Sequence, residues 1–247
     1  MSAPPTFART KRGTMKTILA FGAHPDDVEL SAGGTLARMG AAGHRTVVVD
    51  LTCGELGTRG SGAIRRAEAK EAAKILGLAK REQLGLADGF FELGEGELRT
   101  VVAAIRKFRP EVVLANALSD RHPDHGRAAE LVSRAFFLSG LSRVETPGLE
   151  AWRPQALYHY IQDHHRQPDL VVDITGFEEV KERAILAYAS QFNRAPGDGP
   201  STAISEPGFL DHIRGRQVGM GRSAGFTAGE GFETERPVGV QDLFHLL

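Results

Sequence analysis

The sequence predicts an α/β fold, a Rossmann-like and mostly parallel sheet flanked by helices. Short apolar segments alternate along the chain with amphipathic helical segments, which is the order of elements in folds built from strand-helix-strand units. Residues 16–54 contain one complete unit, with a helical segment between two apolar strands, and parallel strands need a crossover of this kind. The length of 247 residues suits one large α/β domain.

The predicted elements follow one another in a regular order. "KTILAFG" predicts a strand over residues 16–22, and the next helix begins near Val28 and ends before Gly43, because glycine favours the position after a helix. A second strand covers residues 45–54. The pattern then predicts helices over residues 63–77 and 97–110, a strand over residues 111–117 and a helix over residues 125–140.

The C-terminal part of the chain is less regular. Here the pattern predicts an irregular stretch over residues 141–156, followed by a pair of strands over residues 156–162 and 169–175. One amphipathic helix is predicted over residues 177–192. From Asn193 the chain is rich in glycine, which predicts a functional loop or lid with a helix over residues 209–218.

The composition limits the classes of partner. Apolar residues make up 41% of the chain, charged residues 25%, and the formal net charge is -1, which removes the electrostatic basis for binding nucleic acid or a membrane surface. No apolar run reaches the roughly 18 residues that span a bilayer. We expect a small-molecule partner and a single domain over residues 15–247, preceded by a disordered extension over residues 1–14.

Cysteine usage points to the cytoplasm. Cys53 is the only cysteine, so the chain has no internal disulfide and no thiolate cluster for a structural zinc, which fits a reducing compartment. A lone cysteine after a buried strand is more often a small core residue than a reactive one. His164 and His165 lie in a polar segment between strands, and we interpret them as loop residues.

Two tetrapeptides carry the chemistry of the sequence. "HPDD" at residues 24–27 and "HPDH" at residues 122–125 each follow an apolar strand and precede a helix. In open α/β sheets, ligands bind at this carboxyl edge of the strands. Residues three apart on a starting helical turn point to the same side, so each tetrapeptide can present two metal-binding side chains to one point.

Both tetrapeptides together offer more donors than one metal needs. Catalytic zinc takes three protein ligands and leaves a position for water, so a spare carboxylate is available as a general base and a spare imidazole as a general acid. The adjacent Asp26 and Asp27 repel each other unless a cation lies between them. A single "HPDD" is also a good helix start, with Pro25 in the first turn, but two such motifs at strand ends favour a metal site.

At this point the sequence resembles a known family. "AHPDDVELSAGGTL", "TCGELGTRG", "DRHPDHGRAAELV" and "DLVVDITGFEEVKERAILAYASQF" are similar to the PIG-L/LmbE family of zinc-dependent N-acetylglucosaminide deacetylases, and more narrowly to its bacillithiol-biosynthesis branch. The resemblance extends over nearly the whole chain from Met15. It implies a metal-dependent hydrolase that removes the acetyl group from N-acetylglucosaminyl malate.

The resemblance also implies a role for each site residue. It makes His24, Asp27 and His125 the ligands of one Zn²⁺ per chain, Asp26 the general base, and His122 the group that stabilises the oxyanion or protonates the leaving amine. The proposed orienting neighbour of His122, also a candidate substrate contact, is Asp124, and the candidate substrate-binding residues of the "GELGTRG" loop are Arg59 and Glu55. For Glu55, a loop-capping role is an equal alternative.

Several alternatives stay open. Two imidazoles and one carboxylate also suit Fe²⁺ and Co²⁺, and relatives that form hexamers imply a homo-oligomer. Several relatives carry a tyrosine before a Glu-x-Phe element, where this chain has Ala228, so the oxyanion role of that tyrosine is absent, moved or taken by His122. The other functions considered are deacetylation of another small N-acyl amine and a non-catalytic module that binds metal or sugar.

Overall fold

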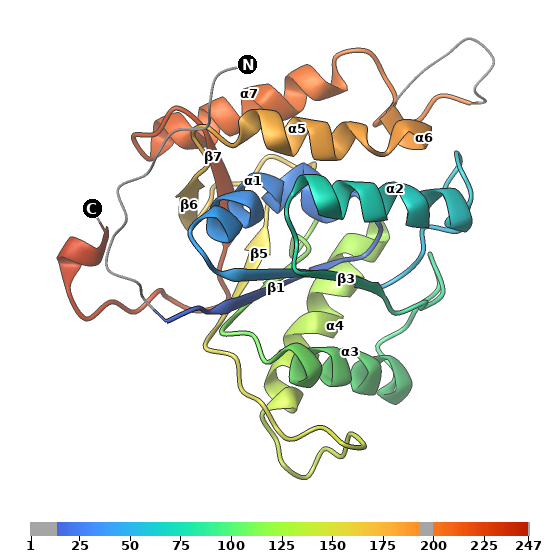
Figure 1. The fold of residues 1–247 in the computed structure, drawn as a ribbon, viewed down its shortest axis with the longest axis vertical. Coiled ribbons are helices and arrows are strands. Elements are labelled where there is room, and N and C mark those ends of the chain that lie inside the picture. Colours follow the sequence, from blue (N-terminus) through green and yellow to red (C-terminus); the bar gives the residue numbers. More distant parts are fainter. Residues whose placement is uncertain (1–13, 193–199, 247) are drawn as a thin grey trace.

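The computed structural model describes residues 14–192 and 200–246, and its strands form one seven-stranded sheet. The sheet order is β3-β2-β1-β4-β5-β7-β6, and the first five strands of this order run parallel (Figure 1). β7 pairs antiparallel with both β5 and β6. The strands are β1 Thr17–Gly22, β2 Arg45–Asp50, β3 Lys80–Gln83, β4 Val112–Ala115, β5 Ala156–Tyr160, β6 Leu170–Asp173 and β7 Gly229–Glu233.

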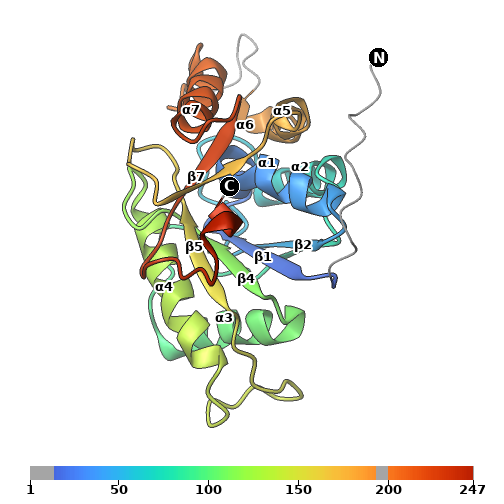
Figure 2. The same cartoon turned by 90° about the vertical axis from the view of Figure 1, so that its left-hand side faces the viewer.

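The helices cover both faces of this sheet. α1 and α2 lie on one face and α3 and α4 on the other, while α5 to α7 lie beyond α1 and α2 (Figures 1 and 2). The helices are α1 Asp27–Ala41, α2 Gly62–Ile75, α3 Glu95–Phe108, α4 Pro123–Ser139, α5 Glu178–Leu186, α6 Ala189–Phe192 and α7 Phe209–Ser223, with a 3₁₀ turn η1 at Leu243–Leu246. This arrangement confirms the predicted fold class.

The central strand β1 explains why the chain folds this way. Its side chains alternate between the two faces, so that Leu19 and Phe21 pack among side chains of α3 and α4, while Ile18 and Ala20 pack against α1. Because both faces are buried, the strand is apolar throughout. Because helices cover both faces of the sheet, a ligand-binding site is expected at the carboxyl ends of β1 and β4.

The sequence pattern does not predict the edge strand β3, because of the composition of this strand. β3 has the sequence "KREQ" and is partly exposed, so it lacks the apolar pattern on which strand prediction depends. Its parallel register with β2, Asp50 opposite Gln83, places the following loop at the same edge of the sheet as the two tetrapeptides.

The prediction of a loop at "GEGFE" is wrong, because these residues form the buried strand β7. The glycines that suggested a loop are needed for packing: an added Cβ at Gly229 would lie 2.5 Å from Val171 Cγ1, and one at Gly231 would lie 2.8 Å from Met220 Sδ. As a result, the predicted strands β5 and β6 exist but are not neighbours, since β7 lies between them.

Two helices differ from their predicted lengths. The single helix expected over residues 177–192 is divided into α5 and α6, and the helix expected over residues 209–218 extends to Ser223. The glycines in α7 obscured its length, although one of them, Gly221, packs directly on the backbone of Ala228. The predicted extension over residues 1–14 lies outside the described residues except for Thr14.

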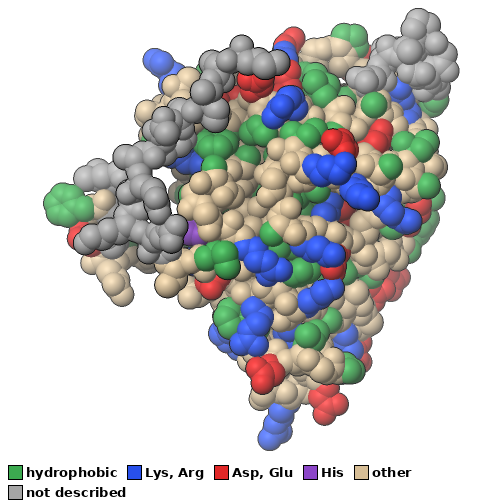
Figure 3. Space-filling model, viewed as in Figure 1, with side chains coloured by type: hydrophobic (Ala, Val, Ile, Leu, Met, Phe, Trp, Pro, Cys, Tyr) green, Lys and Arg blue, Asp and Glu red, His purple; other side chains and the backbone are tan. Residues whose placement is uncertain are grey.

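Lys and Arg side chains on the face in Figure 3 are interspersed with Asp and Glu. Among the helices of the described part of the chain, none combines the length and the apolar character that crossing a bilayer requires.

Candidate metal centre and active site

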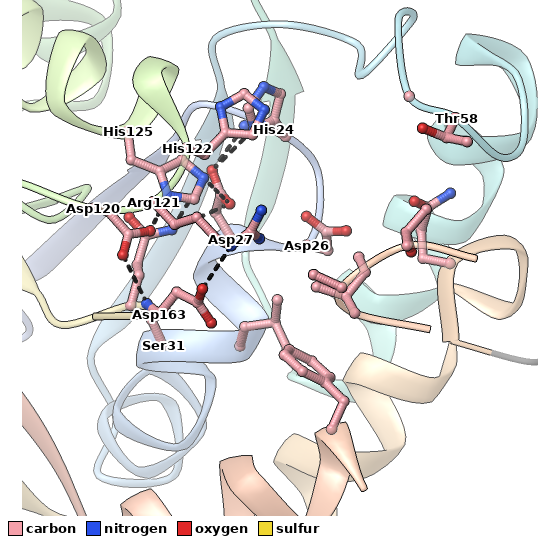
Figure 4. Close-up of a pocket in the computed structure, with 18 of the residues that line it drawn as sticks. His24, Asp26, Asp27, Ser31, Thr58, Asp120, Arg121, His122, His125 and Asp163 are labelled. Atoms are coloured by element: carbon pink, nitrogen blue, oxygen red, sulfur yellow. Dashed lines mark hydrogen bonds and ion pairs between the residues drawn. The ribbon is translucent and has the colours of Figure 1, made fainter. Parts of the chain in front are cut away.

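A pocket opens at the carboxyl ends of β1 and β4, and both tetrapeptides contribute to it (Figure 4). Its remaining walls come from α1, α2, α6 and α7, from the loops after β2, β3 and β5, and from residues 202–204. The lining includes His24, Asp26, Asp27, Leu30, Ser31, Leu56, Thr58, Arg65, Asp88, Asp120, Arg121, His122, His125, Gln162, Asp163, Gln191, Phe209, Ile213 and Arg216.

Asp27 connects the two tetrapeptides. Its Oδ1 lies 3.1 Å from His125 Nε2, and its Oδ2 lies 3.7 Å from His24 Nδ1. Oδ2 also accepts hydrogen bonds from the backbone N–H of His24 at 2.9 Å and from Asn116 Nδ2 at 3.0 Å. These bonds fix the carboxylate between the imidazoles, so residues about one hundred positions apart meet at one point.

The three imidazoles lie close together. The ring centroids of His24 and His122 are 4.6 Å apart, and those of His122 and His125 are 5.1 Å apart. Each of the three histidines offers a nitrogen within 4.8 Å of the others. Figure 4 shows this group at one end of the pocket, next to Asp27.

Carboxylates hold His24 and His125 on the sides of their rings that face away from Asp27. His24 Nε2 lies 3.0 Å from Asp88 and 3.3 Å from Asp124, and His125 Nδ1 lies 2.5 Å from Asp120. A histidine that ligates metal usually donates its other ring N–H to such a partner, which fixes the tautomer and the ring orientation. The arrangement therefore leaves His24 Nδ1 and His125 Nε2 facing Asp27.

The electrostatics of this group fit a cation. Burial alone would lower the pKa of His24, but contacts with Asp124, Asp27 and Asp88 raise it well above its ordinary value. Burial alone would raise the pKa of Asp27, yet His125 and His24 hold it well below its usual range. The cluster thus favours positive charge where imidazoles and carboxylates meet, and its nitrogen and oxygen donors suit Zn²⁺, Fe²⁺ or Co²⁺.

Asp26 lies in the pocket wall under strain. Its φ of 118° is in the left-handed region, which costs a residue with a side chain about 1–3 kcal/mol. Its side chain is only 7% exposed and lies 2.9 Å from Arg65 Nη2, and Arg65 also donates to the carbonyl oxygen of Pro25. Burial raises the pKa of Asp26 to about 7, against the opposite effect of Arg65. A carboxylate with this pKa is suited to accept a proton near neutral pH.

His122 occupies a different position from His24. It caps α4, because its Nδ1 accepts a hydrogen bond from the backbone N–H of Asp124 at 3.2 Å. An Nδ1 that accepts leaves the proton of a neutral ring on Nε2. Burial, together with His24 and His125, lowers the pKa of His122. Its ring lines the pocket and is available for contact with a substrate.

The structure places three other predicted site residues away from the pocket lining. The Asp124 side chain is fully buried and contacts His24 and Arg127, which favours positioning of His24 over contact with a substrate. The Glu55 carboxylate accepts from the backbone N–H groups of Cys53 and Asp88, at 3.1 and 3.0 Å, so it stabilises its loop. Arg59 is buried, and its carbonyl oxygen accepts a hydrogen bond from Gln191.

Sequence patterns did not single out several residues that the pocket brings together. Asp88 follows the unpredicted strand β3, and Arg65 lies in a helical segment, "AIRRAEAK", that resembles an exposed amphipathic helix. Asp120 and Gln162 follow β4 and β5, so the rule that ligands bind at carboxyl strand ends contained a usable signal for both.

No tyrosine lines the pocket in the described part of the chain. The hydroxyl groups of Tyr160 and Tyr188 are buried and donate to Phe21 O and Glu29 Oε1. Ala228, where the resemblance leads us to expect a tyrosine, is buried, and its carbonyl oxygen accepts a hydrogen bond from the N–H of Ile174. Two side chains were candidates for stabilising the oxyanion, a tyrosine and His122. Among the described residues, only His122 of these lines the pocket.

Comparisons with known proteins point to one family. Residues 19–136 match the family described as PIG-L: GlcNAc-PI de-N-acetylase. The chain is 33% identical over 192 residues to the diacetylchitobiose deacetylase of Thermococcus kodakarensis, covering 72% of this chain and 71% of the relative. The crystal structure of the conserved protein TT1542 from Thermus thermophilus superposes with a TM-score of 0.82 and 35% identity, over 93% of this chain and 99% of that chain.

Two further relatives show how broad the family is. A probable N-acetyl-α-D-glucosaminyl L-malate deacetylase 2 of Bacillus anthracis is 29% identical, over 68% of this chain and 78% of the relative. The 4-oxalmesaconate hydratase of Pseudomonas putida is 28% identical, over 74% and 77%. The malate deacetylase is thus less similar than the chitobiose deacetylase, and the predicted bacillithiol branch is matched only distantly.

Proposed function

Because the chain belongs to the PIG-L family, whose deacetylases are metal-dependent amide hydrolases, we propose that it removes the acetyl group from an N-acetylglucosaminyl conjugate. The observation that carries this proposal is the position of the Asp27 carboxylate between His24 and His125, at 3.7 and 3.1 Å. We assign these three residues as the ligands of one Zn²⁺, with Fe²⁺ or Co²⁺ as alternatives. Bound there, the metal would polarise an amide carbonyl and make water a stronger acid.

The neighbouring side chains supply the proton transfers. Asp26 accepts the proton of the attacking water, since its carboxylate lines the pocket beside Asp27 and has a pKa of about 7. His122 donates a hydrogen bond to the oxyanion from Nε2, the ring nitrogen not occupied in capping α4. The C–N bond then breaks, the amine nitrogen receives the proton that Asp26 took from the water, and acetate and the amino sugar leave.

The substrate we propose within this class is N-acetylglucosaminyl malate or a similar anionic conjugate. The motif resemblance to the bacillithiol branch and the malate deacetylase among the relatives support it. A neutral oligosaccharide, as in the name of the chitobiose deacetylase, is the alternative to compare. The hydratase relative shows that this similarity extends to a protein named for another reaction, so amine release itself must be measured.

Metal removal tests the reaction. Protein treated with a chelator and dialysed should release no amine from N-acetylglucosaminyl malate or diacetylchitobiose, because the Lewis acid of the reaction is then missing and His24, Asp27 and His125 are only its ligands. Release should return with one equivalent of Zn²⁺ per chain, measured by an amine-reactive assay and by metal analysis. Chelator already saturated with Zn²⁺ is the control. Chelator-insensitive release would reject a metal-dependent hydrolase, and no release after zinc loading would reject hydrolysis altogether and favour a binding module or a hydratase.

A further inference from the structure

Arg216 differs from the other arginines that line the pocket. Its Nη2 donates to the carbonyl oxygen of Leu30 at 2.9 Å, and no carboxylate of the described residues lies within 4.0 Å of its guanidinium. By contrast, Arg65 is paired with Asp26 at 2.9 Å and Arg121 with Asp163 at 2.6 Å. Arg216 is only partly exposed, and a cation in such a place is costly unless an anion accompanies it.

The nearby acidic groups do not neutralise this charge directly. Three carboxylates act on Arg216 from a distance, and each has a closer partner. Glu230 accepts from Lys181 Nζ at 2.7 Å and from the backbone N–H groups of Gly34 and Thr35. Asp163 is bound by Arg121, and Asp120 lies 2.5 Å from His125. The guanidinium therefore retains capacity for an additional anion.

Arg216 lies on the face of α7 that lines the pocket, and it contacts α1, the helix that begins at Asp27. Phe209, Ile213 and Arg216 are spaced four and three residues apart on α7, so they share the face that lines the pocket. The contact with Leu30 O joins the guanidinium to α1, where the next residue, Ser31, also lines the pocket and stands four residues after Asp27. Along the axis of α1, one helical turn of about 5.4 Å separates Ser31 from Asp27.

We propose that Arg216 binds a carboxylate or other anionic group on the aglycone of the substrate and so determines specificity for anionic conjugates. In a 2-acetamido sugar, the carbon that bears the aglycone is bonded to the carbon that bears the amide. The aglycone therefore lies close to the reacting group, and Arg216 and Asp27 line the same pocket. The guanidinium fork can bind a carboxylate through two N–H groups, while Phe209 and Ile213 contact carbon atoms.

This inference rests on the proposed function, and a pair of ligands that differ in charge tests it. The probes are N-acetylglucosaminyl malate and its uncharged diamide. In the zinc enzyme, Arg216→Gln should lower kcat/KM for the malate conjugate about 10- to 100-fold, mainly through KM, and change kcat/KM for the diamide little. Arg216→Lys should recover part of the loss, since it keeps the charge but not the fork. The control is Arg214→Gln, because Arg214 is exposed on the same helix and paired with Glu182 and Asp211.

Direct binding separates failure of the subsite from failure of the reaction. Calorimetric Kd values for both probes are measured with the same variants, and thermal unfolding verifies that each is folded. Equal losses for malate and diamide in Arg216→Gln would overturn the anion subsite even if deacetylation is confirmed. If no amine is released but Arg216 still determines the preference for the charged probe in binding, the subsite stands and the proposed reaction is wrong.

Discussion

The two tetrapeptides are alike in sequence but begin their helices differently. In "HPDH", His122 caps α4 with φ of −84° and the helix begins at Pro123. In "HPDD", the helix α1 begins only at Asp27, and Asp26 stands at the cap position in the left-handed region. The start of the helix thus shifts by two residues between motifs that share three residue types of four.

This shift gives the third residues of the motifs different environments. Asp26 lines the pocket and is paired with Arg65, whereas Asp124 is fully buried, is paired with Arg127 at 2.7 Å and contacts His24 from its far side. The fourth residues, Asp27 and His125, point to each other at 3.1 Å. The comparison teaches that helix register, rather than residue type, determines which aspartate faces a substrate.

The largest expected effect is a loss of turnover when Asp26, rather than Asp124, is substituted. Asp26→Asn should lower kcat of the zinc enzyme by about 10²- to 10⁴-fold, because it removes the general base, while zinc content stays at one per chain. Steady-state amine release and metal analysis measure both quantities. Asp211→Asn on the exposed side of α7 is the control. An Asp26→Asn enzyme with nearly normal kcat would mean that another group accepts the proton.

Substitution of Asp124 should have a smaller effect, and it should change zinc affinity rather than kcat. Asp124→Asn should weaken zinc affinity by about 10- to 100-fold, because the carboxylate holds His24 through Nε2. With saturating zinc, kcat should fall far less than in Asp26→Asn. Competition with a chromophoric chelator gives the affinity. A large loss of kcat at full zinc occupancy with unchanged affinity would instead place Asp124 at the substrate, as the sequence interpretation also allowed.

Sequence patterns were most informative where one local rule decides the structure. The parallel strands β1, β2 and β4 are continuous apolar runs, and their carboxyl ends located both tetrapeptides at one edge. Patterns were least informative where tertiary packing decides. Gly229 and Gly231 look like loop residues, yet they allow Val171 and Met220 to pack on β7. No local signal distinguishes Arg65, which lines the pocket, from Arg59, which does not.

The same limit applies to the strain at Asp26, since nothing in "HPDD" indicates a positive φ. A comparison of glycine with alanine isolates it, because both substitutions remove the carboxylate and differ only in Cβ. At position 26, glycine should give the higher free energy of unfolding by about 1 kcal/mol, because φ of 118° disfavours any Cβ. At position 124, within α4, alanine should be more stable by about 0.5–1 kcal/mol. Urea unfolding of the zinc-free variants measures the two differences, and equal signs at both positions would show that the turns do not differ in backbone strain.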